Sequence, residues 1–392
     1  MFPFIRKLRG MLIKTFTRAI EVKLPFYDQV HSHDQYTFSS NTDQNRLFHN
    51  SQLKLSFDNK YLKKSEILLT MTSDTFKKNR AWLLVALLSL LMPIILFISV
   101  LIYFYDSYVR CRLCKNIAGE VAVVTGAAGG LGKCIAAELA AKGCHVAICD
   151  INFDLAVITA KEIADRYGVK AKAYKVDVTK YDEIVELNEK LTTEIGAATI
   201  LVNNAALLYH ADQLNPTVEE FEAMINVNYI SHLWTNRVFL ENMKCAKKGH
   251  IVAISSMAAI KTVLQMEPYC SAKTAVRTLM RVLRAELRLN NITGIDVTTV
   301  FPSFMTTNVG VEQFARDSGY AEIYPLYSGE EMAQRTVRGM LRGEVEIVMP
   351  EYYMIIYRFI AILPSCVQDL LAFSPSLAKS TYLRALEAMK KL

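Results

Sequence analysis

Short apolar runs rich in β-branched residues alternate with longer helical patterns through most of the chain, from about residue 115 to residue 350. This alternation is typical of parallel βαβ units, in which helices cover both faces of one sheet. The pattern therefore predicts one α/β domain over 115–350, built on a doubly wound parallel sheet. The predicted strands are residues 121–125, 145–150, 172–177, 199–203, 250–255 and 296–301.

One segment, residues 81–105, breaks this pattern because it runs for 25 positions without a charged side chain. At about 1.5 Å per residue, a helix of this length crosses a bilayer core of about 30 Å. A buried core helix is the alternative, but a helix that is apolar on every face needs lipid or a large protein around it. Pro93 lies in the middle of the run, a position that membrane-spanning helices tolerate. The sequence thus predicts a single-pass transmembrane anchor.

The segments outside the anchor and the α/β domain differ from both. Residues 1–80 carry 14 Lys and Arg against seven Asp and Glu, which accounts for the whole formal net charge of +7. They predict a polar, basic, disordered extension, and no basic excess remains for a nucleic-acid-binding domain. Residues 351–392 begin with an aromatic and aliphatic run that either packs on the domain or lies on a membrane. Basic residues flank the anchor on both sides, so charge leaves its orientation open.

The eight cysteines form no even framework, and several lie inside apolar runs, so we expect reduced thiols. Reduced thiols favour a cytosolic α/β domain, although Asn291 begins a glycosylation sequon that a lumenal domain would use. Cys111 and Cys114 have the spacing of a metal-binding or lipid-modified pair, but no second Cys pair or His accompanies them. No metal site is expected.

The first predicted strand leads straight into TGAAGGLGKC, residues 125–134. Gly126, Gly130 and Gly132 allow a tight turn and the close approach of a pyrophosphate, whose charge is favoured at the N-terminus of the following helix. A tight turn without a ligand is the alternative, but an acid at the end of the next strand completes the dinucleotide-binding pattern of a Rossmann-like fold. Asp150, 18 residues after Gly132, can accept hydrogen bonds from the ribose hydroxyls of NAD. Its charge disfavours the 2′-phosphate of NADP, so NAD is the predicted cofactor and NADP the less favoured one.

The segment EPYCSAKTAV, residues 267–276, places Tyr269 and Lys273 one helical turn apart on one face. A free tyrosine has a pKa of about 10, and a nearby cation can stabilise its phenolate enough for it to act as a base. The pair is therefore a candidate for removing the proton of an alcohol.

Several motifs occur together, in order and with matching spacing. They are TGAAGGLG, Asp177-Val178, NNAA at 203–206, the serine pair at 255–256 and YxxxK at 269–273. In this set the chain resembles the short-chain dehydrogenase/reductase family over roughly residues 118–345. The stretches ILVNNAALLYHADQL and NVNYISHLWT are similar to the membrane-anchored branch that contains retinol dehydrogenases and 17β-hydroxysteroid dehydrogenases. An N-terminal anchor is typical of that branch.

The resemblance implies a role for each matching residue. It makes Tyr269 the catalytic acid/base, with Lys273 as its partner and as a ligand of the nicotinamide ribose. It makes Ser256 the hydrogen-bonding partner of the substrate oxygen, and Asn228 the residue that positions a water for proton relay. The implied cofactor-binding residues are Gly126, Gly130, Leu131, Gly132, Asp150, Asp177, Val178, Asn203, Ala205, Tyr269, Lys273, Pro302 and Thr307.

Two positions depart from the family's usual motifs. The usual NNAG is NNAA here, which places a methyl group at Ala206, and the usual PG after the sixth strand is Pro302-Ser303. A methyl group at Ala206 is harmless if its φ is negative. Ser303 puts the geometry of the loop near the nicotinamide, and with it catalytic efficiency, in question.

These features predict NAD-dependent interconversion of a lipophilic alcohol and its carbonyl, with retinol or a hydroxysteroid ahead of long-chain lipid alcohols. Residues 304–330, which should cover the substrate, are apolar and aromatic enough for such an alcohol. A non-catalytic scaffold on a lipid surface and an NADPH-dependent carbonyl reductase are the alternatives. The resemblance further implies a homodimer through the helices near 217–244 and 267–289, and a location on endoplasmic reticulum or lipid-droplet membranes.

Overall fold

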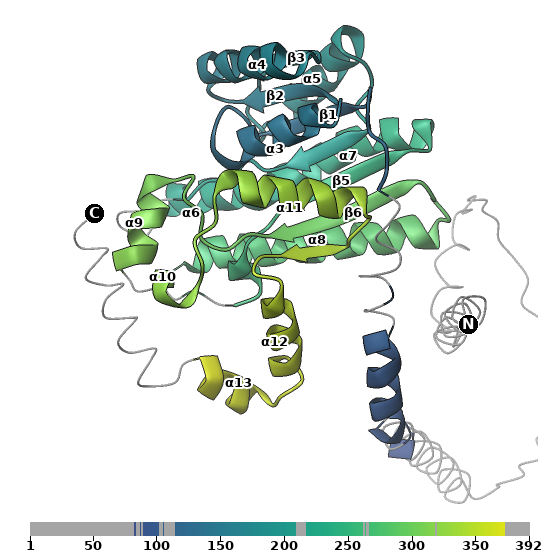
Figure 1. Ribbon diagram of the computed structural model, residues 1–392, viewed down its shortest axis with the longest axis vertical. Coiled ribbons are helices and arrows are strands. Elements are labelled where there is room, and N and C mark those ends of the chain that lie inside the picture. The colour runs from purple at the N-terminus through teal and green to yellow at the C-terminus, as the bar shows by residue number, and fades with distance from the viewer. Residues whose placement is uncertain are drawn as a thin grey trace, which may run out of the picture. The chain divides into compact units, whose positions relative to one another are not determined.

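The computed structural model describes a set of ranges that contains most of the α/β domain (Figure 1). They are residues 82–83, 87, 89–101, 105, 114–208, 217–261, 263, 266–317 and 320–372. Residues 89–101 are helical, and within the described ranges no helix has both the length and the apolarity needed to cross a membrane. The predicted extension 1–80, part of the predicted anchor 81–105 and the chain after residue 372 lie outside the described residues.

Seven parallel strands form the sheet, in the order β3-β2-β1-β4-β5-β6-β7. They are β1 (Val121–Thr125), β2 (His145–Asp150), β3 (Ala171–Lys175), β4 (Ile200–Asn203), β5 (Gly249–Ile254), β6 (Ile295–Phe301) and β7 (Glu346–Val348). Every residue of β1, β4 and β5 is buried, as expected of parallel strands that are covered on both faces. The predicted doubly wound parallel sheet is therefore confirmed.

Two layers of helices cover the sheet, one on each face (Figure 1). The first layer contains α3 (Gly130–Ala141), α4 (Phe153–Tyr167) and α11 (Gly329–Leu341). The second contains α5 (Tyr181–Glu194), α7 (Ser231–Ala246) and α8 (Glu267–Leu289). Each layer buries one apolar stripe per helix, with Ile135 and Met332 in the first core and Phe239 and Val276 in the second.

Shorter elements lie at the ends of these helices and strands. They are α6 (Val218–Ile225), the π-helical turn η2 (Asn226–Ile230), the 3₁₀ turn η3 (Met257–Ala259), α9 (Val309–Asp317), α10 (Tyr320–Ile323), α12 (Tyr352–Ile360) and α13 (Ser365–Ala372). Local sequence sets several boundaries. Thr217 and Ser328 cap α6 and α11 through reciprocal bonds with Glu220 and Glu331, and Gly168 ends α4 in the left-handed conformation.

Two details of the sheet differ from the sequence-based prediction. β3 ends at Lys175, so Val176 and Asp177 follow the strand instead of belonging to it. β7 was not predicted, because a strand of three residues is too short to show periodicity. The strand order reverses between β1 and β4, and loops that leave a parallel sheet at such a point diverge and create a crevice at the carboxyl ends of the strands.

The turn from β1 into α3 is built so tightly that it requires glycine. Gly126 and Gly130 have positive φ angles of 63° and 55°. Gly132 has no such angle, but a Cβ there would lie 2.2 Å from the carbonyl oxygen of Gly126 and 2.5 Å from Nδ2 of Asn204. The turn, the start of α3 and the loop after β4 are therefore in direct contact.

We expect Gly132→Ala to destabilise the protein by about 2 to 3 kcal/mol, because the new methyl group forces this contact apart. Gly168→Ala is the matched control: its φ is 66° and a Cβ would have open space, so we expect a loss of only about 1 kcal/mol. Denaturant unfolding of both variants measures the difference. An equal loss in the two variants would contradict the tight packing of the turn.

Candidate active site

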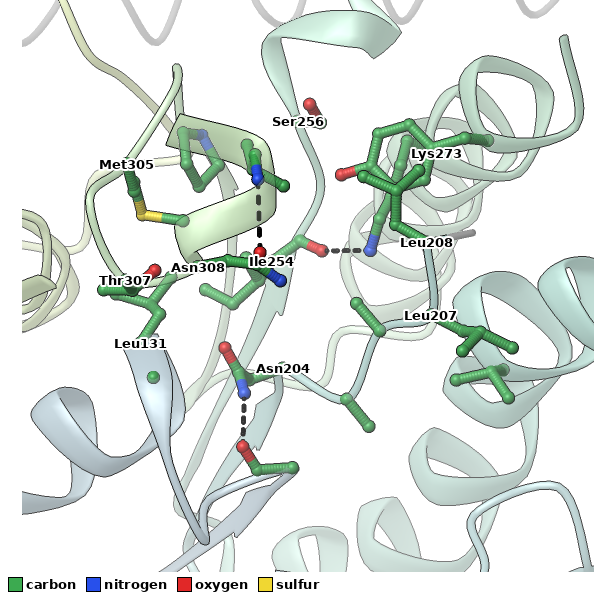
Figure 2. Close-up of a pocket in the computed structure, with 18 of the residues that line it drawn as sticks. Leu131, Asn204, Leu207, Leu208, Ile254, Ser256, Lys273, Met305, Thr307 and Asn308 are labelled. Atoms are coloured by element: carbon green, nitrogen blue, oxygen red, sulfur yellow. Dashed lines mark hydrogen bonds between the residues drawn. The ribbon is translucent and has the colours of Figure 1, made fainter. Parts of the chain in front are cut away.

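A cavity of about 800 Å³ lies at the carboxyl ends of the strands, lined by the turn after β1 and by the loops after β2 to β6. Twelve of the predicted site residues line it: Gly126, Gly130, Leu131, Asp150, Asp177, Val178, Ala205, Ser256, Tyr269, Lys273, Pro302 and Thr307. Figure 2 shows Leu131 and Thr307 at one side of this cavity and Ser256 and Lys273 at another. Residues that are far apart in the sequence thus meet at one site.

Ser256 and Tyr269 approach each other across the segment between β5 and α8. Ser256 caps the turn η3, and its hydroxyl oxygen accepts a hydrogen bond of 3.1 Å from the amide of Ala258. Tyr269 lies in the first turn of α8, partly exposed to the cavity, and hydrogen bonds to Ser256. A substrate oxygen at this point would meet two hydroxyl groups at once.

Lys273 lies one turn further along α8 and is only 1% exposed. Its Nζ donates a 3.0 Å hydrogen bond to the carbonyl oxygen of Ile254 (Figure 2) and lies 5.7 Å from the centre of the Tyr269 ring. Burial lowers the pKa of Lys273 to about 7. Burial also raises the pKa of Tyr269, while the hydrogen bond with Ser256 acts in the opposite direction. Burial therefore favours the neutral form of both groups.

Asn228 lies behind this group, in the π-helical turn η2, and is fully buried. Its Nδ2 donates to the carbonyl oxygens of Leu207 (2.7 Å) and Met224 (3.0 Å), and its Oδ1 accepts from the amide of Leu207 at 3.3 Å. Asn228 itself does not line the cavity. It holds the loop after β4, and two residues of this loop, Leu207 and Leu208, line the cavity. Single π-helical turns inside helices are frequent at functional sites. The water relay implied for Asn228 stays a prediction.

The structure places Asn203 differently from the sequence-based prediction. Its side chain is buried and bonds to Thr235 and Asn236 of α7, away from the cavity. The next residue, Asn204, takes the place at the cavity (Figure 2): its Nδ2 donates to the carbonyl oxygens of Thr125 (3.0 Å) and Gly126 (2.9 Å), and one of these two bonds is drawn in the figure. The alternation of side chains at the end of β4 decides which asparagine faces the glycine turn, and the motif NNAA does not reveal it.

Asp150 connects the glycine turn to the end of β2. One carboxylate oxygen accepts from the amide of Ala128 and the other from the amide of Asn152, both at 3.0 Å. Lys133, the cation that could soften the preference against a 2′-phosphate, forms an ion pair of 2.6 Å with Glu162. The carboxylate therefore lines the cavity while the neighbouring lysine is already paired.

The two departures from the family motifs both lie on the cavity. Ala206 and Ser303 line it, and neither adopts the left-handed backbone conformation, which among the described non-glycine residues occurs only at Lys247 and Asn291. The methyl group of Ala206 therefore introduces no backbone strain.

His232 is a buried residue beside the site that the motifs did not single out. It lies on α7, is 1% exposed, and neither ring nitrogen has a hydrogen-bond partner among the described residues. Burial and the nearby charge of Lys273 hold its pKa well below the usual value, so the ring is neutral. Its position four residues after Asn228, one helical turn along, is the only sequence signal that could have drawn attention to it.

Comparison with known proteins agrees with this geometry. A family model described as short chain dehydrogenase matches residues 120–318. The protein 17-beta-hydroxysteroid dehydrogenase 13 of Homo sapiens is 31% identical over 281 residues, which are 71% of this chain and 91% of that protein. Estradiol 17-beta-dehydrogenase 11 of Mus musculus is 31% identical over 66% of this chain and 86% of its own length.

Among solved structures, an alcohol dehydrogenase from the archaeon Thermococcus sibiricus, complexed with 5-hydroxy-NADP, has a TM-score of 0.51 and 25% identity. The match covers 58% of this chain and 95% of that one. The glycine turn, the parallel sheet and the Tyr269–Lys273 pair thus agree with sequence similarity over most of the domain. The chain belongs to the short-chain dehydrogenase/reductase family, in which it is similar to the 17β-hydroxysteroid dehydrogenases.

Proposed function

We propose that the protein is an NAD-dependent oxidoreductase that interconverts a lipophilic alcohol and its carbonyl, with retinol or a hydroxysteroid as the leading substrates. The meeting of Ser256, Tyr269 and Lys273 at the same cavity as the glycine turn carries this proposal. A scaffold on a lipid surface would need neither a buried lysine nor a tyrosine beside it.

The residues around the cavity fit a dinucleotide. The helix α3 begins at Gly130 after Gly129, which as a glycine offers no side-chain cap, so the first amide groups of the helix can bind a pyrophosphate. Asp150 would accept from the ribose hydroxyls, and its charge together with the pairing of Lys133 favours NAD over NADP. Bound NAD supplies the acceptor for the hydride of the carbinol carbon.

The protein's own groups would handle the proton and the substrate oxygen. Tyr269 takes the hydroxyl proton in oxidation and returns it in reduction, while Ser256 holds the oxygen. Lys273 stabilises the phenolate form of Tyr269, because its ammonium lies close to the Tyr269 ring in a buried site that excludes water. Asn228 keeps the loop after β4 in place and is proposed to position the water of the proton relay.

The wall of the cavity beyond Ser256 suits an apolar substrate. Phe304 and Tyr320 stack there with ring centres 5.5 Å apart, and Leu208, Met266 and Val311 add aliphatic surface. Such a wall stabilises a lipophilic alcohol through burial of its carbon skeleton and offers little to a sugar.

Association with a membrane is part of the proposal, with residues 81–105 as the anchor, 115–350 as the catalytic domain, and endoplasmic reticulum or lipid droplets as the location. The apolar side chains of α12 and the following turn support it, since Ile355, Phe359 and Ile362 are exposed there. A homodimer through α6 and α8 is proposed as well, because Val218 and Val282 expose apolar surface on these helices.

We expect Tyr269→Phe to lower kcat for alcohol oxidation at least about a thousandfold, because the proton acceptor is removed while the ring remains. Formation of NADH by membranes that contain the wild type or the variant, offered all-trans-retinol, a 17β-hydroxysteroid or a long-chain secondary alcohol, measures the effect. NAD binding, followed by fluorescence quenching, should be unchanged. Equal turnover in both proteins would rule out Tyr269 as the acid/base.

We expect Asp150→Ser to lower the ratio of kcat/KM with NAD to kcat/KM with NADP at least tenfold. The change removes both the acceptor for the ribose hydroxyls and the charge that repels a 2′-phosphate. Asp154→Ser is the control, because Asp154 is an exposed acid on α4 that does not line the cavity. A ratio that stays constant in Asp150→Ser would show that another group selects the cofactor.

The activity should depend on pH with opposite signs in the two directions. Below pH 7 Lys273 is an ammonium and cannot take up the proton of the alcohol. Above about pH 7, the pKa to which burial lowers Lys273, its neutral amine can receive the proton that Tyr269 passes on when it takes the hydroxyl proton of the alcohol. Oxidation should therefore rise and reduction fall as pH increases through about 7. Profiles of kcat/KM in both directions from about pH 5 to 10 test this, and parallel profiles would contradict it.

A further inference from the structure

Four charged side chains line the cavity among the described residues: Asp150, Asp177, Lys261 and Lys273. Asp150 ends β2 and Asp177 follows β3, where the adenosine end of a dinucleotide is expected, and Lys273 serves Tyr269. Lys261 has no role in the proposed reaction. It lies in the segment between β5 and α8, five residues after Ser256, and so in the part of the cavity where the substrate is expected.

The surroundings of Lys261 contain hydroxyl groups in place of a counter-ion. Its Nζ donates a hydrogen bond of 2.5 Å to the hydroxyl of Tyr324 and lies 5.1 Å from the centre of that ring. The hydroxyls of Tyr324 and Tyr353 are 3.0 Å apart. Among the described residues, no carboxylate forms an ion pair with Lys261. The cation is therefore half-buried beside the cavity, and no carboxylate in the part of the chain that the structure describes is paired with it.

The two tyrosines cannot supply that charge at neutral pH. Burial raises the pKa of Tyr324, and burial together with the hydrogen bond to Tyr324 raises that of Tyr353. Both are neutral phenols. The ammonium group of Lys261 has three hydrogen-bond donors, so two phenol oxygens leave at least one of these donors without an acceptor.

A purely structural role for Lys261 would be to connect the loop after β5 to α10 and α12 through the tyrosines. A neutral hydrogen-bonding side chain would make the same connection without the free-energy penalty of burying an unbalanced charge. A ligand that brings a negative charge would remove this penalty. The neighbouring wall, with Phe304 stacked on Tyr320, indicates that the rest of that ligand is apolar.

We propose that Lys261, assisted by the hydroxyl of Tyr324, binds a carboxylate at the end of the substrate remote from the reacting alcohol, so that the preferred substrates are hydroxylated lipid acids. This inference rests on the proposed function, since it takes Ser256 and Tyr269 as the place of the reacting hydroxyl. In the weakly polar cavity a carboxylate attracts the ammonium more strongly than it does in water. A neutral steroid or retinol would lack this interaction.

The test uses full-length protein in detergent, saturated with NADH so that neither probe is oxidised during the titration, and two probes that differ in charge: ricinoleic acid, a secondary alcohol with a carboxylate, and its methyl ester. Isothermal titration gives the ratio of the two Kd values, and comparison of this ratio between variants cancels partition into detergent. We expect the wild type to favour the acid at least tenfold. Lys261→Met should abolish this preference, and Lys261→Arg should retain it.

Lys190→Met is the matched control, because Lys190 is an exposed lysine on α5 that does not line the cavity. If Lys261→Met unfolds, Tyr324→Phe removes the assisting hydroxyl while keeping the ring, and it should lower the preference at least threefold. A wild type that binds acid and ester equally, or binds neither, overturns the inference.

Turnover of both probes by the same protein preparations, now supplied with NAD, separates the two proposals. Selective binding of the acid without NADH formation from either probe would count against the proposed function and leave the carboxylate site standing. NADH formation from both probes without any preference for the acid would sink the carboxylate site alone.

Discussion

The attachment of Lys273 to the end of β5 is the interaction on which the site depends. Its Nζ donates to the carbonyl oxygen of Ile254, and its own carbonyl oxygen accepts from the hydroxyl of Ser255 at 2.8 Å. These two bonds connect the first turns of α8 to the strand that Ser256 follows, which brings Tyr269 next to Ser256. They also keep the ammonium out of water, and this burial is what lowers its pKa into the physiological range. The attachment of Lys273 to the end of β5 therefore determines both the position of Tyr269 beside Ser256 and the pKa of Lys273.

The reversal of strand order between β1 and β4 gives this group access to a dinucleotide. Asn204 bridges the reversal by donating to Thr125 and Gly126, so the glycine turn and the loop after β4 are joined by two hydrogen bonds. Gly132 permits this close approach, because a Cβ there would collide with the carbonyl oxygen of Gly126 and with Nδ2 of Asn204. The charges along the cavity follow the same division: carboxylates lie at or after the ends of β2 and β3, and lysines lie after β5.

The sequence was sufficient for the sheet and for many of the residues that line the cavity. Six of seven strands were predictable, since buried parallel strands are runs of β-branched residues, and YxxxK follows from helical spacing. The features of the site that were not predicted depend on local backbone geometry and on contacts between distant segments, which a single sequence does not reveal. The choice between Asn203 and Asn204 depends on the pleat at the end of β4. The burial of His232 without a partner and the position of Lys261 beside Tyr324 arise only when distant segments pack together.

The part of the cavity that is proposed to hold the substrate is built from elements that come later in the chain than Ser256 and Tyr269. The helix α12 connects this part to the molecular surface. Tyr353 reaches the hydroxyl of Tyr324, and Met354 packs with Phe301 in a small core, while Phe359 on the same helix is exposed. The helix thus has one side against Tyr324 of the cavity wall and another available to an apolar surface. If α12 lies on a lipid layer, as proposed, a hydroxylated lipid acid would have a short path from that layer to the wall. The carboxylate would then leave the polar boundary of the lipid only when it binds Lys261. The interaction with Lys261 would thus offset the free-energy cost of moving the charge, and the same residue would select the substrate.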